Sequence, residues 1–518
     1  MADRFRVSYA TLSVENEDLH IAYEEGLKLA RNWCGATLPV RVDGDARRAG
    51  TTFTITSPVD SSLTLCIVHS ATGEDVDDAV AAARGALPGW TARPWRERVE
   101  LLRRAADLIN ERANELAALM SLEVGKNRLE ALGDAEESAD LIRYYCGQVE
   151  DNDGFVRPMN TLSDRERTSS VLRPYGVWGV ISPFNFPMAL AAGPVGAALV
   201  AGNSVVLKPS PQGSFTADKL YECLRDAGLP AGVLHVLPGG DEVGAAIVKH
   251  TDVDGLTFTG SYAVGMEIHR TFSSAYPKPV ICEMGGNNPA IVSAQADLNV
   301  AADGISRSAF GFAGQKCSAC SRVYVQREVY DEFLEKLAER ARRVTVGDPT
   351  ERDVYMGPLV DDTAVERFAR TVADVGGKGR VVVGGAVLKH SPQGHYVQPT
   401  VMADLPLDHP VFRDELFVPI VAVAAVDSLD EAITLANRTD LGLTAGFFSN
   451  DDAEVERFLD RIEAGVVYIN RAAGATTGAW PGIQPFGGWK GSGNSGKAGG
   501  GLYYVQLYLR EQSRTVVL

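Results

Sequence analysis

The residues best suited to chemistry lie in FAGQKCSACSR, residues 312–322, where Cys317 stands among small and polar residues. The text changes there from helix-like to strand-like. A free thiol has a pKa near about 8.5 and needs a cation or a helix N-terminus nearby to ionise at neutral pH. Taken alone, the segment is compatible with a reactive thiolate, an inert buried cysteine, or a redox pair of Cys317 and Cys320.

Two further segments carry polar groups that follow predicted strands. Asn185 in ISPFNFP, residues 181–187, offers a side-chain N–H donor after a strand end. Glu283 in ICEMGGNNP, residues 281–289, ends an apolar strand just before a pair of glycines. A carboxylate there is costly to bury unless it has a role. Each has an ordinary alternative, because asparagines are common in turns and a carboxylate can cap a strand end.

Together, in order and spacing, the three segments resemble the aldehyde dehydrogenase superfamily. The texts KPS (208–210), FTGSYAVG (258–265), MGPLV (356–360), DELFVP (414–419) and PFGG (485–488) extend the resemblance from about residue 36 to the end. It implies that Cys317 attacks an aldehyde and that the Asn185 amide and the Cys317 backbone N–H hold the oxyanion. Hydride then passes to a nicotinamide, and Glu283 activates water against the thioester. The presence of Glu283 favours a free acid as product over an acyl-coenzyme A.

The same resemblance implies a site for NAD, with NADP also open. GSYAVG is not the usual GxGxxG fingerprint, and the pyrophosphate is expected near a helix N-terminus beside Ser261. Lys208 would reach the adenine-side ribose, Glu415 would bind the nicotinamide ribose, and Phe417 would pack beside the nicotinamide. The full expected set is Ser182, Pro183, Lys208, Ser210, Gly240, Gly260, Ser261, Gly265, Glu415 and Phe417.

Two positions depart from the family pattern around this cofactor site. Pro211 stands where NAD-preferring relatives often carry an acidic residue, which removes a repulsion towards the 2′-phosphate of NADP. Asn287 stands where many relatives have lysine, and the sequence does not give its consequence.

Within the superfamily, Ser318 after the nucleophile, the text TTGAWPGIQPFGGWKGSG (476–493) and the tail LREQSRT resemble 1-pyrroline-5-carboxylate dehydrogenases. The resemblance implies oxidation of glutamate γ-semialdehyde to glutamate in proline catabolism. The expected substrate contacts are Phe186 and Phe486 on the aliphatic part, Ser318, Gly478 and Ala479 on the α-carboxylate, and Glu137 on the ammonium. Glu137 is equally well explained as part of a solvated helix face. Ala479, where some relatives have serine, and the bulky Trp480 leave another semialdehyde or an aliphatic aldehyde as the alternative. A non-catalytic protein on this fold is the third hypothesis.

Composition favours an enzyme acting on small molecules. The 518 residues suggest two to four domains, and the net charge of −17 argues against binding nucleic acid. Seven scattered cysteines suggest reduced thiols, and the first twenty residues lack an apolar core, so a cytoplasmic protein without a signal peptide is expected. No metal site is expected. The uncharged stretch 184–207 contains Pro and Gly residues that favour a buried helix and a strand over a membrane span.

The expected fold is α/β and aldehyde-dehydrogenase-like. Long helices are predicted at 76–87, 96–125 and 128–150. Strands at 176–181, 204–209, 233–237 and 255–260 alternate with helices at 214–228 and 263–274, which indicates a parallel Rossmann-type sheet. A second α/β region includes a helix at 328–344 and a strand within 417–426.

Four parts are assigned along the chain, two of them built from two segments each. They are an N-terminal helical extension (1–35), an NAD(P)-binding domain (36–158 and 173–286), a catalytic domain (287–490) and a β-ribbon arm (159–172 and 494–518). The apolar arm predicts a homo-oligomer, either a dimer or a multiple of dimers.

Overall fold

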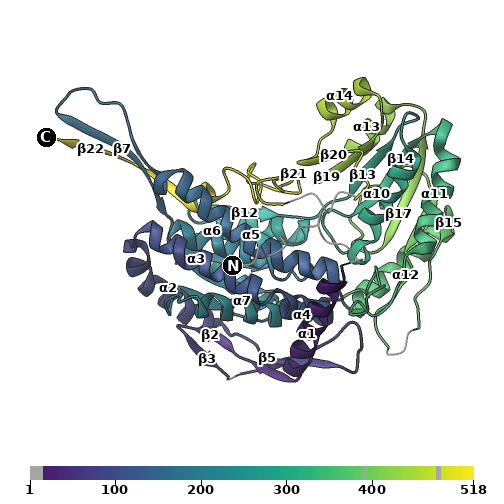
Figure 1. The fold of residues 1–518 in the computed structure, drawn as a ribbon. Coiled ribbons are helices and arrows are strands. Elements are labelled where there is room, and N and C mark those ends of the chain that lie inside the picture. The colour runs from purple at the N-terminus through teal and green to yellow at the C-terminus, as the bar shows by residue number, and fades with distance from the viewer. Residues whose placement is uncertain (1–15, 49, 390–392, 474–479) are drawn as a thin grey trace.

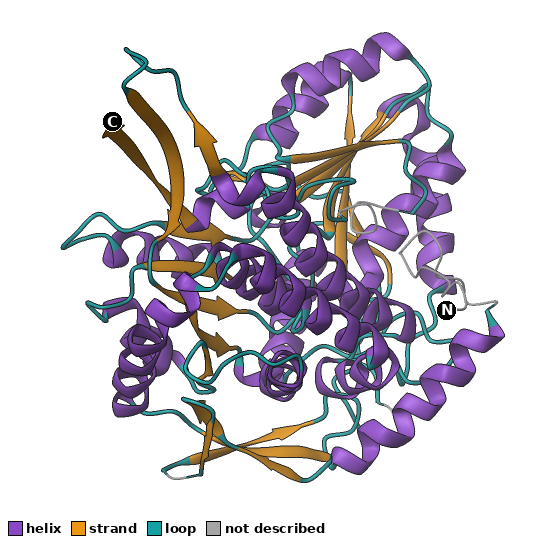
Figure 2. Cartoon of the chain, turned by 60° about the vertical axis from the view of Figure 1, so that its left-hand side comes forward, coloured by secondary structure: helices purple, strands orange, loops and turns teal. Residues whose placement is uncertain are grey.

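The computed structural model describes residues 16–48, 50–389, 393–473 and 480–518. Two α/β bodies lie side by side, and a long β-ribbon extends from the first of them with the C-terminus at its tip (Figures 1 and 2). Each body has a seven-stranded sheet of its own and its own hydrophobic core. The segments that carry the predicted chemistry lie at the ends of strands from both sheets.

The first sheet has the order β12-β11-β8-β9-β10-β2-β3. Its strands are β2 (Val40–Val42), β3 (Asp45–Arg47), β8 (Val177–Ser182), β9 (Ser204–Pro209), β10 (Leu234–Val236), β11 (Gly255–Thr259) and β12 (Val280–Glu283). The five from β8 to β12 are parallel, as predicted, while β2 runs antiparallel beside β10. The register pairs Ser182 with Pro209 and Thr259 with Glu283. The predicted site residues at these strand ends therefore share one edge of the sheet.

Helices cover both faces of this sheet, as its crossover connections require. They are α2 (Gly73–Ala92), α3 (Trp95–Glu111), α4 (Ala113–Val124), α5 (Arg128–Asp151), α6 (Ala189–Ala201), α7 (Ser214–Asp226), α8 (Asp241–Lys249) and α9 (Tyr262–Phe272). The uncharged stretch 184–207 is a buried helix followed by a buried strand, α6 and β9, as predicted. Within the described ranges, no helix combines the length and the apolar character that crossing a membrane requires.

The single helix predicted over 96–125 is wrong, because the chain turns at Arg112, whose φ of −101° and ψ of 9° are not helical. The turn brings α4 against α1 (Glu17–Trp33). A Cβ added to Gly26 of α1 would lie 2.5 Å from the carbonyl carbon of Asn114, so the two helix backbones nearly touch there. Packing against α1 therefore decides where α3 ends, and the helical periodicity of the segment does not reveal it.

The second sheet has the order β15-β16-β17-β14-β13-β19-β20 and is parallel except at β15. Its strands are β13 (Asn288–Val292), β14 (Cys320–Gln326), β15 (Arg380–Val383), β16 (Thr400–Ala403), β17 (Ile420–Val426), β19 (Thr444–Phe448) and β20 (Val466–Ile469). Its helices are α10 (Leu298–Phe310), α11 (Tyr330–Arg343), α12 (Asp362–Gly376), α13 (Leu429–Asn437) and α14 (Asp452–Arg461). The minor strands are β1 (Ala36–Leu38), β4 (Thr52–Thr56), β5 (Thr64–His69), β18 (Leu441–Gly442) and β21 (Trp489–Lys490).

The extended ribbon consists of β6 (Val156–Pro158), β7 (Glu166–Pro174) and β22 (Leu509–Val517), paired antiparallel. Its tip exposes apolar side chains, with Leu162 97% and Val517 71% accessible. The residues just before β22 behave differently, because Tyr508 is buried against Trp178 with ring centroids 4.5 Å apart. Part of segment 494–518 thus packs into the first body, and the domain boundaries stay a prediction.

Candidate active site

Cys317 follows a tight buried turn between α10 and β14. Phe312, Ala313 and Gly314 have φ angles of 50°, 53° and 68°, a left-handed run that is unusual for non-glycine residues. The Gln315 amide anchors the turn, donating to Pro358 O at 3.3 Å and accepting from Val360 N at 2.9 Å. This contact explains why the text MGPLV, far along the chain, belongs to the same motif set. The residues just before Cys317 therefore hold a backbone geometry that their sequence alone does not favour.

Glu283 ends β12, and the glycine pair after it allows close approach of two other segments. A Cβ on Gly285 would lie 2.1 Å from the Glu415 carboxylate, and one on Gly286 would lie 2.5 Å from the Cys317 carbonyl oxygen. The Gly286 N–H donates to Glu415 Oε1 at 3.0 Å. The glycine pair therefore lets Glu283, Cys317 and Glu415 meet where the two bodies face each other.

Burial dominates the electrostatics of these three groups. Burial, together with the nearby charges of Glu415 and Glu283, raises the pKa of Cys317 to about 12. Burial also raises the pKa of Glu283 to about 8, opposed by a hydrogen bond from the Gly488 backbone. It raises the pKa of Glu415 to about 7, opposed by the Gly286 N–H and the charge of Arg367. In this state the thiol is neutral, and Glu283 can change charge close to neutral pH.

Glu283 is partly accessible as a residue, but its Oε2 atom is buried and has no hydrogen-bond partner among the described residues. A buried carboxyl oxygen without a partner carries a cost of roughly 1–3 kcal/mol. No hydrogen bond among the described residues compensates for that cost. It is the kind of group that a bound water or substrate would satisfy.

Asn185 lies in the turn between β8 and α6 and is 3% exposed. Its neighbours tie this turn to two other parts of the site. The Phe184 ring meets the Phe417 ring edge-on with centroids 6.0 Å apart, and the Lys126 ammonium lies 3.5 Å from the centroid of Phe186. The predicted residues Asn185, Phe186 and Phe417 are therefore neighbours in space.

A buried charge network under this turn was missed in the sequence. Lys126 and Asp134 form a fully buried ion pair at 2.7 Å, and Asp134 also accepts from the Ala189 N–H at the start of α6. Nearby, Lys316 pairs with Glu130, which links the residue before Cys317 to α5. Charged residues such as Glu130 and Asp134 on one helix normally indicate a solvated face, so the sequence offers no signal of their burial.

The expected cofactor residues of the sheet edge lie close together. Ser182 ends β8, and its buried hydroxyl has no hydrogen-bond partner among the described residues. The backbone of Ser210 donates to Ser182 O at 2.8 Å, and Pro183 follows Ser182. Lys208 is buried at the end of β9, and the first turn of α8 covers it, because a Cβ on Gly244 would lie 3.5 Å from its Cδ. Gly240 precedes that turn as the N-cap of α8.

The GSYAVG segment forms the N-terminus of α9. Ser261 is the N-cap and accepts from the Val264 N–H at 3.5 Å. A Cβ on Gly260 would lie 2.5 Å from the Phe258 ring, and one on Gly265 would lie 2.5 Å from the Met284 sulfur. The glycines thus let α9 pack closely over β11 and β12, leaving its first N–H groups at the sheet edge.

The expected substrate residues are placed unevenly. Ser318 is buried beside Cys317, Phe486 bridges to Gly499, and Glu137 lies half-buried on α5. Gly478 and Ala479 lie outside the described residues. Next to them, the Trp480 indole donates to Asp140 of α5 at 2.9 Å, one turn from Glu137. This contact attaches the end of the predicted substrate loop to the helix that carries Glu137.

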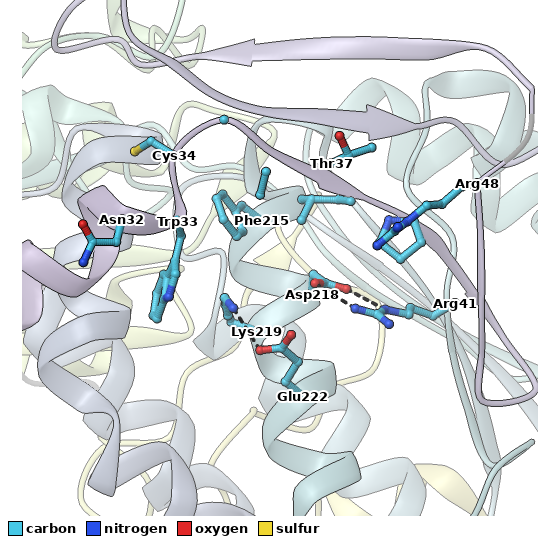
Figure 3. Close-up of a pocket in the computed structure, with 14 residues that line it drawn as sticks. Asn32, Trp33, Cys34, Thr37, Arg41, Arg48, Phe215, Asp218, Lys219 and Glu222 are labelled. Atoms are coloured by element: carbon cyan, nitrogen blue, oxygen red, sulfur yellow. Dashed lines mark hydrogen bonds and ion pairs between the residues drawn. The ribbon is translucent and has the colours of Figure 1, made fainter.

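A separate pocket of about 520 Å³ lies between the end of α1, the strand that follows, and α7 (Figure 3). Two ion pairs lie in its lining, Arg41 with Asp218 at 2.8 Å and Lys219 with Glu222 at 2.9 Å. It contains none of the predicted site residues.

Comparison with known proteins agrees with this arrangement. Residues 46–513 match the aldehyde dehydrogenase family. A 1-pyrroline-5-carboxylate dehydrogenase of Bacillus cytotoxicus is 37% identical over 513 residues, covering 98% of this chain and 97% of that protein. Another, 1-pyrroline-5-carboxylate dehydrogenase 1 of Halalkalibacterium halodurans, is 38% identical over 506 residues, with 96% and 95% covered.

Solved structures agree as well. The 1-pyrroline-5-carboxylate dehydrogenase from Thermus with bound NAD superposes with a TM-score of 0.94 at 31% identity, with both chains fully covered. Proline utilization A from Bdellovibrio bacteriovorus gives a TM-score of 0.91 at 36% identity, and the match spans 96% of this chain but 52% of that one. These likenesses confirm the predicted fold class and the predicted resemblance. The chain belongs to the aldehyde dehydrogenase family.

Proposed function

We propose that this protein oxidises glutamate γ-semialdehyde to glutamate with NAD as hydride acceptor, through a thioester on Cys317. The observation that carries the proposal is the meeting of Cys317, Glu283 and Glu415 around the Gly285–Gly286 pair. A thiol, a carboxyl with a pKa near neutrality and a second carboxyl facing the cofactor edge are the groups this oxidation needs. The names of the similar proteins support the choice of substrate.

In the first half-reaction, the Cys317 thiol loses its proton to solvent, and the resulting thiolate forms a C–S bond with the aldehyde carbon while the carbonyl oxygen becomes an oxyanion. The Asn185 amide and the Cys317 N–H would hold that oxyanion, and each such donor contributes roughly 3–4 kcal/mol. Bound NAD supplies a hydride acceptor for the aldehyde hydrogen. The thiohemiacetal on Cys317 thereby becomes a thioester.

In the second half-reaction, Glu283 removes a proton from water, whose oxygen attacks the thioester carbon. The C–S bond breaks, the acid leaves, and Cys317 returns as a thiolate. A general base works best when its pKa lies near the working pH. The pKa of Glu283, raised by burial to about 8, meets that condition, whereas an exposed glutamate near 4.5 would be a weak base.

The residues present fit NAD. Among the described residues, the buried Ser182 hydroxyl has no hydrogen-bond partner. The first turn of α9 offers N–H groups, and Lys208 and Glu415 stand at the two ends of the expected cofactor path. We propose that NAD is preferred over NADP despite Pro211. The Glu242 carboxylate turns back to the Gly240 N–H at 3.2 Å, and the charges of Asp241 and Glu242 both act on the Lys208 ammonium. A 2′-phosphate beside Lys208 would meet these two negative charges.

We further propose that Ser318, with Gly478 and Ala479, binds the substrate α-carboxylate, that Phe186 and Phe486 line the aliphatic part, and that Glu137 binds the ammonium. We also propose a cytoplasmic homo-oligomer joined through the ribbon. The seven free cysteines and the exposed apolar ribbon tip support it.

The test is steady-state turnover on glutamate γ-semialdehyde and butanal, each with NAD and with NADP. Butanal has no α-carboxylate, so the protein donors that would bind one stay unpaired, at a cost of about 1–3 kcal/mol each. The semialdehyde should therefore exceed butanal in kcat/KM by at least about a hundredfold. Ser318→Ala should narrow that ratio, since it removes one donor and leaves the aliphatic contacts intact. Equal efficiency on both aldehydes would refute the substrate, and absence of turnover on any aldehyde would refute the activity.

A further inference from the structure

Two adjacent asparagines follow the glycine pair, and their side chains serve two different segments of the site. The Asn288 amide donates to Cys317 O at 2.7 Å and Ala319 O at 2.9 Å, and its oxygen accepts from Thr444 N at 2.9 Å. Asn288 therefore holds the turn that carries the nucleophile. Successive residues at the start of a strand point to opposite sides, so Asn287 faces away from this turn.

Asn287 is 2% exposed and uses its whole amide group. Its Nδ2 donates to Asp414 O at 3.0 Å and to Val411 O at 3.4 Å. Its Oδ1 accepts from the Ser321 hydroxyl at 2.6 Å. The backbone is held as well, because Arg322 Nε donates to Asn287 O at 2.9 Å.

These contacts join the segment after Glu283 to the segment that carries Glu415. Asp414, which accepts from Asn287, is the residue directly before Glu415, and the Glu415 carboxylate accepts from Gly286, directly before Asn287. Ser321 lies four residues after Cys317, at the start of β14. Asn287 thus connects the stretch after the nucleophile and the stretch before Glu415 through direct hydrogen bonds.

We propose that Asn287 is a positioning residue that holds Glu415 in place relative to Cys317, so that the nicotinamide end of NAD lies in line for hydride transfer. The proposal rests on the proposed function, because the position of Glu415 relative to Cys317 matters only if Glu415 binds the nicotinamide ribose. The Asn287 side chain is a neutral amide that makes three hydrogen bonds, and it adds no charge beside Glu415.

Comparing the dehydrogenase reaction with an esterase reaction separates a positioning effect of Asn287 from general damage to the protein. Hydride transfer depends on alignment of the nicotinamide, and small misplacements cost rate steeply. Hydrolysis of p-nitrophenyl acetate needs the Cys317 thiolate, an oxyanion donor and water attack, but no hydride transfer. Loss of the Asn287 contacts should therefore slow the dehydrogenase and spare the esterase reaction.

The experiment compares Asn287→Leu, Asn287→Asp and Ser321→Ala with the wild type. Leucine and aspartate are close to asparagine in shape, and aspartate keeps the acceptor for Ser321 but loses both donors. We expect Asn287→Leu and Asn287→Asp to lower dehydrogenase kcat at least about tenfold, with esterase activity within about twofold. The isotope effect of a deuterated aldehyde on kcat should rise. Ser321→Ala should fold readily and show the same split at smaller size.

Asn203→Leu is the matched control. Asn203 is 0% exposed and also makes three such bonds, accepting from Gly176 N and donating to Ala198 O and Tyr508 O, away from the site. The Asn203→Leu variant should change the dehydrogenase and esterase activities equally, or change neither.

Parallel loss of dehydrogenase and esterase activity in the Asn287 variants would overturn the proposal, as would unchanged kcat in Ser321→Ala. Calorimetric binding of NAD separates the two levels of inference. If wild-type protein binds no NAD, the proposed function fails. If it binds NAD and Glu415→Gln leaves kcat and KM unchanged, the positioning role alone fails.

Discussion

Glu283→Gln is expected to produce one equivalent of NADH per active site and then nearly stop. Acylation needs the Cys317 thiolate and the hydride acceptor, whereas release of the acid needs a base for water. Glutamine keeps the size of the side chain and removes the base. Loss of a positioned base typically costs 10²–10⁴-fold, so the steady rate should fall at least about a hundredfold, or roughly 2.7 kcal/mol.

The pH dependence follows from the same group. With a pKa of about 8, Glu283 is about half ionised at pH 8 and about one per cent ionised at pH 6. Where deacylation limits turnover, wild-type kcat should rise about tenfold per pH unit up to about pH 7.5 and then level. Glu283→Gln should lose that rise, because no carboxylate titrates there.

Stopped-flow absorbance of NADH measures both quantities in a single mixing experiment. The burst amplitude reports acylation, and the slope after it reports thioester hydrolysis. A variant that shows no burst but slow linear turnover would place Glu283 before hydride transfer. Retention of more than about a tenth of the wild-type slope would mean that another group activates water.

Four further outcomes are expected. Cys317→Ser should leave less than about a tenth of the dehydrogenase rate while calorimetric binding of NAD stays nearly unchanged, and a higher rate would refute its role. Cys320→Ala should keep full activity under reducing conditions, whereas inactivity would favour a redox pair. Glu242→Gln should raise the NADP-to-NAD ratio of kcat/KM about tenfold by removing one charge near Lys208, and an unchanged ratio would exclude it from cofactor choice. Burial lowers the pKa of His235 to about 4. As the pH falls, the unfolded chain therefore takes up a proton on this histidine before the folded protein does. The free energy of unfolding, measured with urea, should fall by up to about 3 kcal/mol between pH 6.5 and 4, and the fall should be smaller in His235→Gln.

The sequence predicted the parallel sheet of the first body and placed several motif residues at the ends of its strands. Lys208 and Glu283 sit at carboxyl ends of parallel strands, and such ends share one edge. Once the alternation of strands and helices is recognised, residues at strand ends become neighbours without further information. Cys317 reaches the same edge from the second sheet, and there the family resemblance supplied what local patterning could not.

Contacts between distant segments were beyond such reasoning. Trp480 bonds to Asp140, which lies 340 residues earlier, and nothing in either segment indicates the other. Asp134 lies on a helix rich in charged residues, which suggests a solvated face, yet it forms a fully buried ion pair with Lys126. The consequence of Asn287 also depends on its partners, since a buried amide is defined by the carbonyls and hydroxyls around it.

Several residues of the proposed site carry a local cost in conformation or in hydrogen bonding, and this gives an argument for function that does not depend on resemblance. Phe312, Ala313 and Phe417 adopt left-handed φ angles of 50°, 53° and 58°, each a conformation that non-glycine residues rarely hold. Ser182 and Glu283 each bury a polar atom without a hydrogen-bond partner among the described residues. Such costs persist where the surrounding structure enforces them, here through the Gln315 anchor and the Asn287 and Asn288 contacts. A fold under selection for stability alone could remove these costs with small substitutions, so the costs held beside Cys317 and Glu283 agree with the chemistry proposed for these two residues.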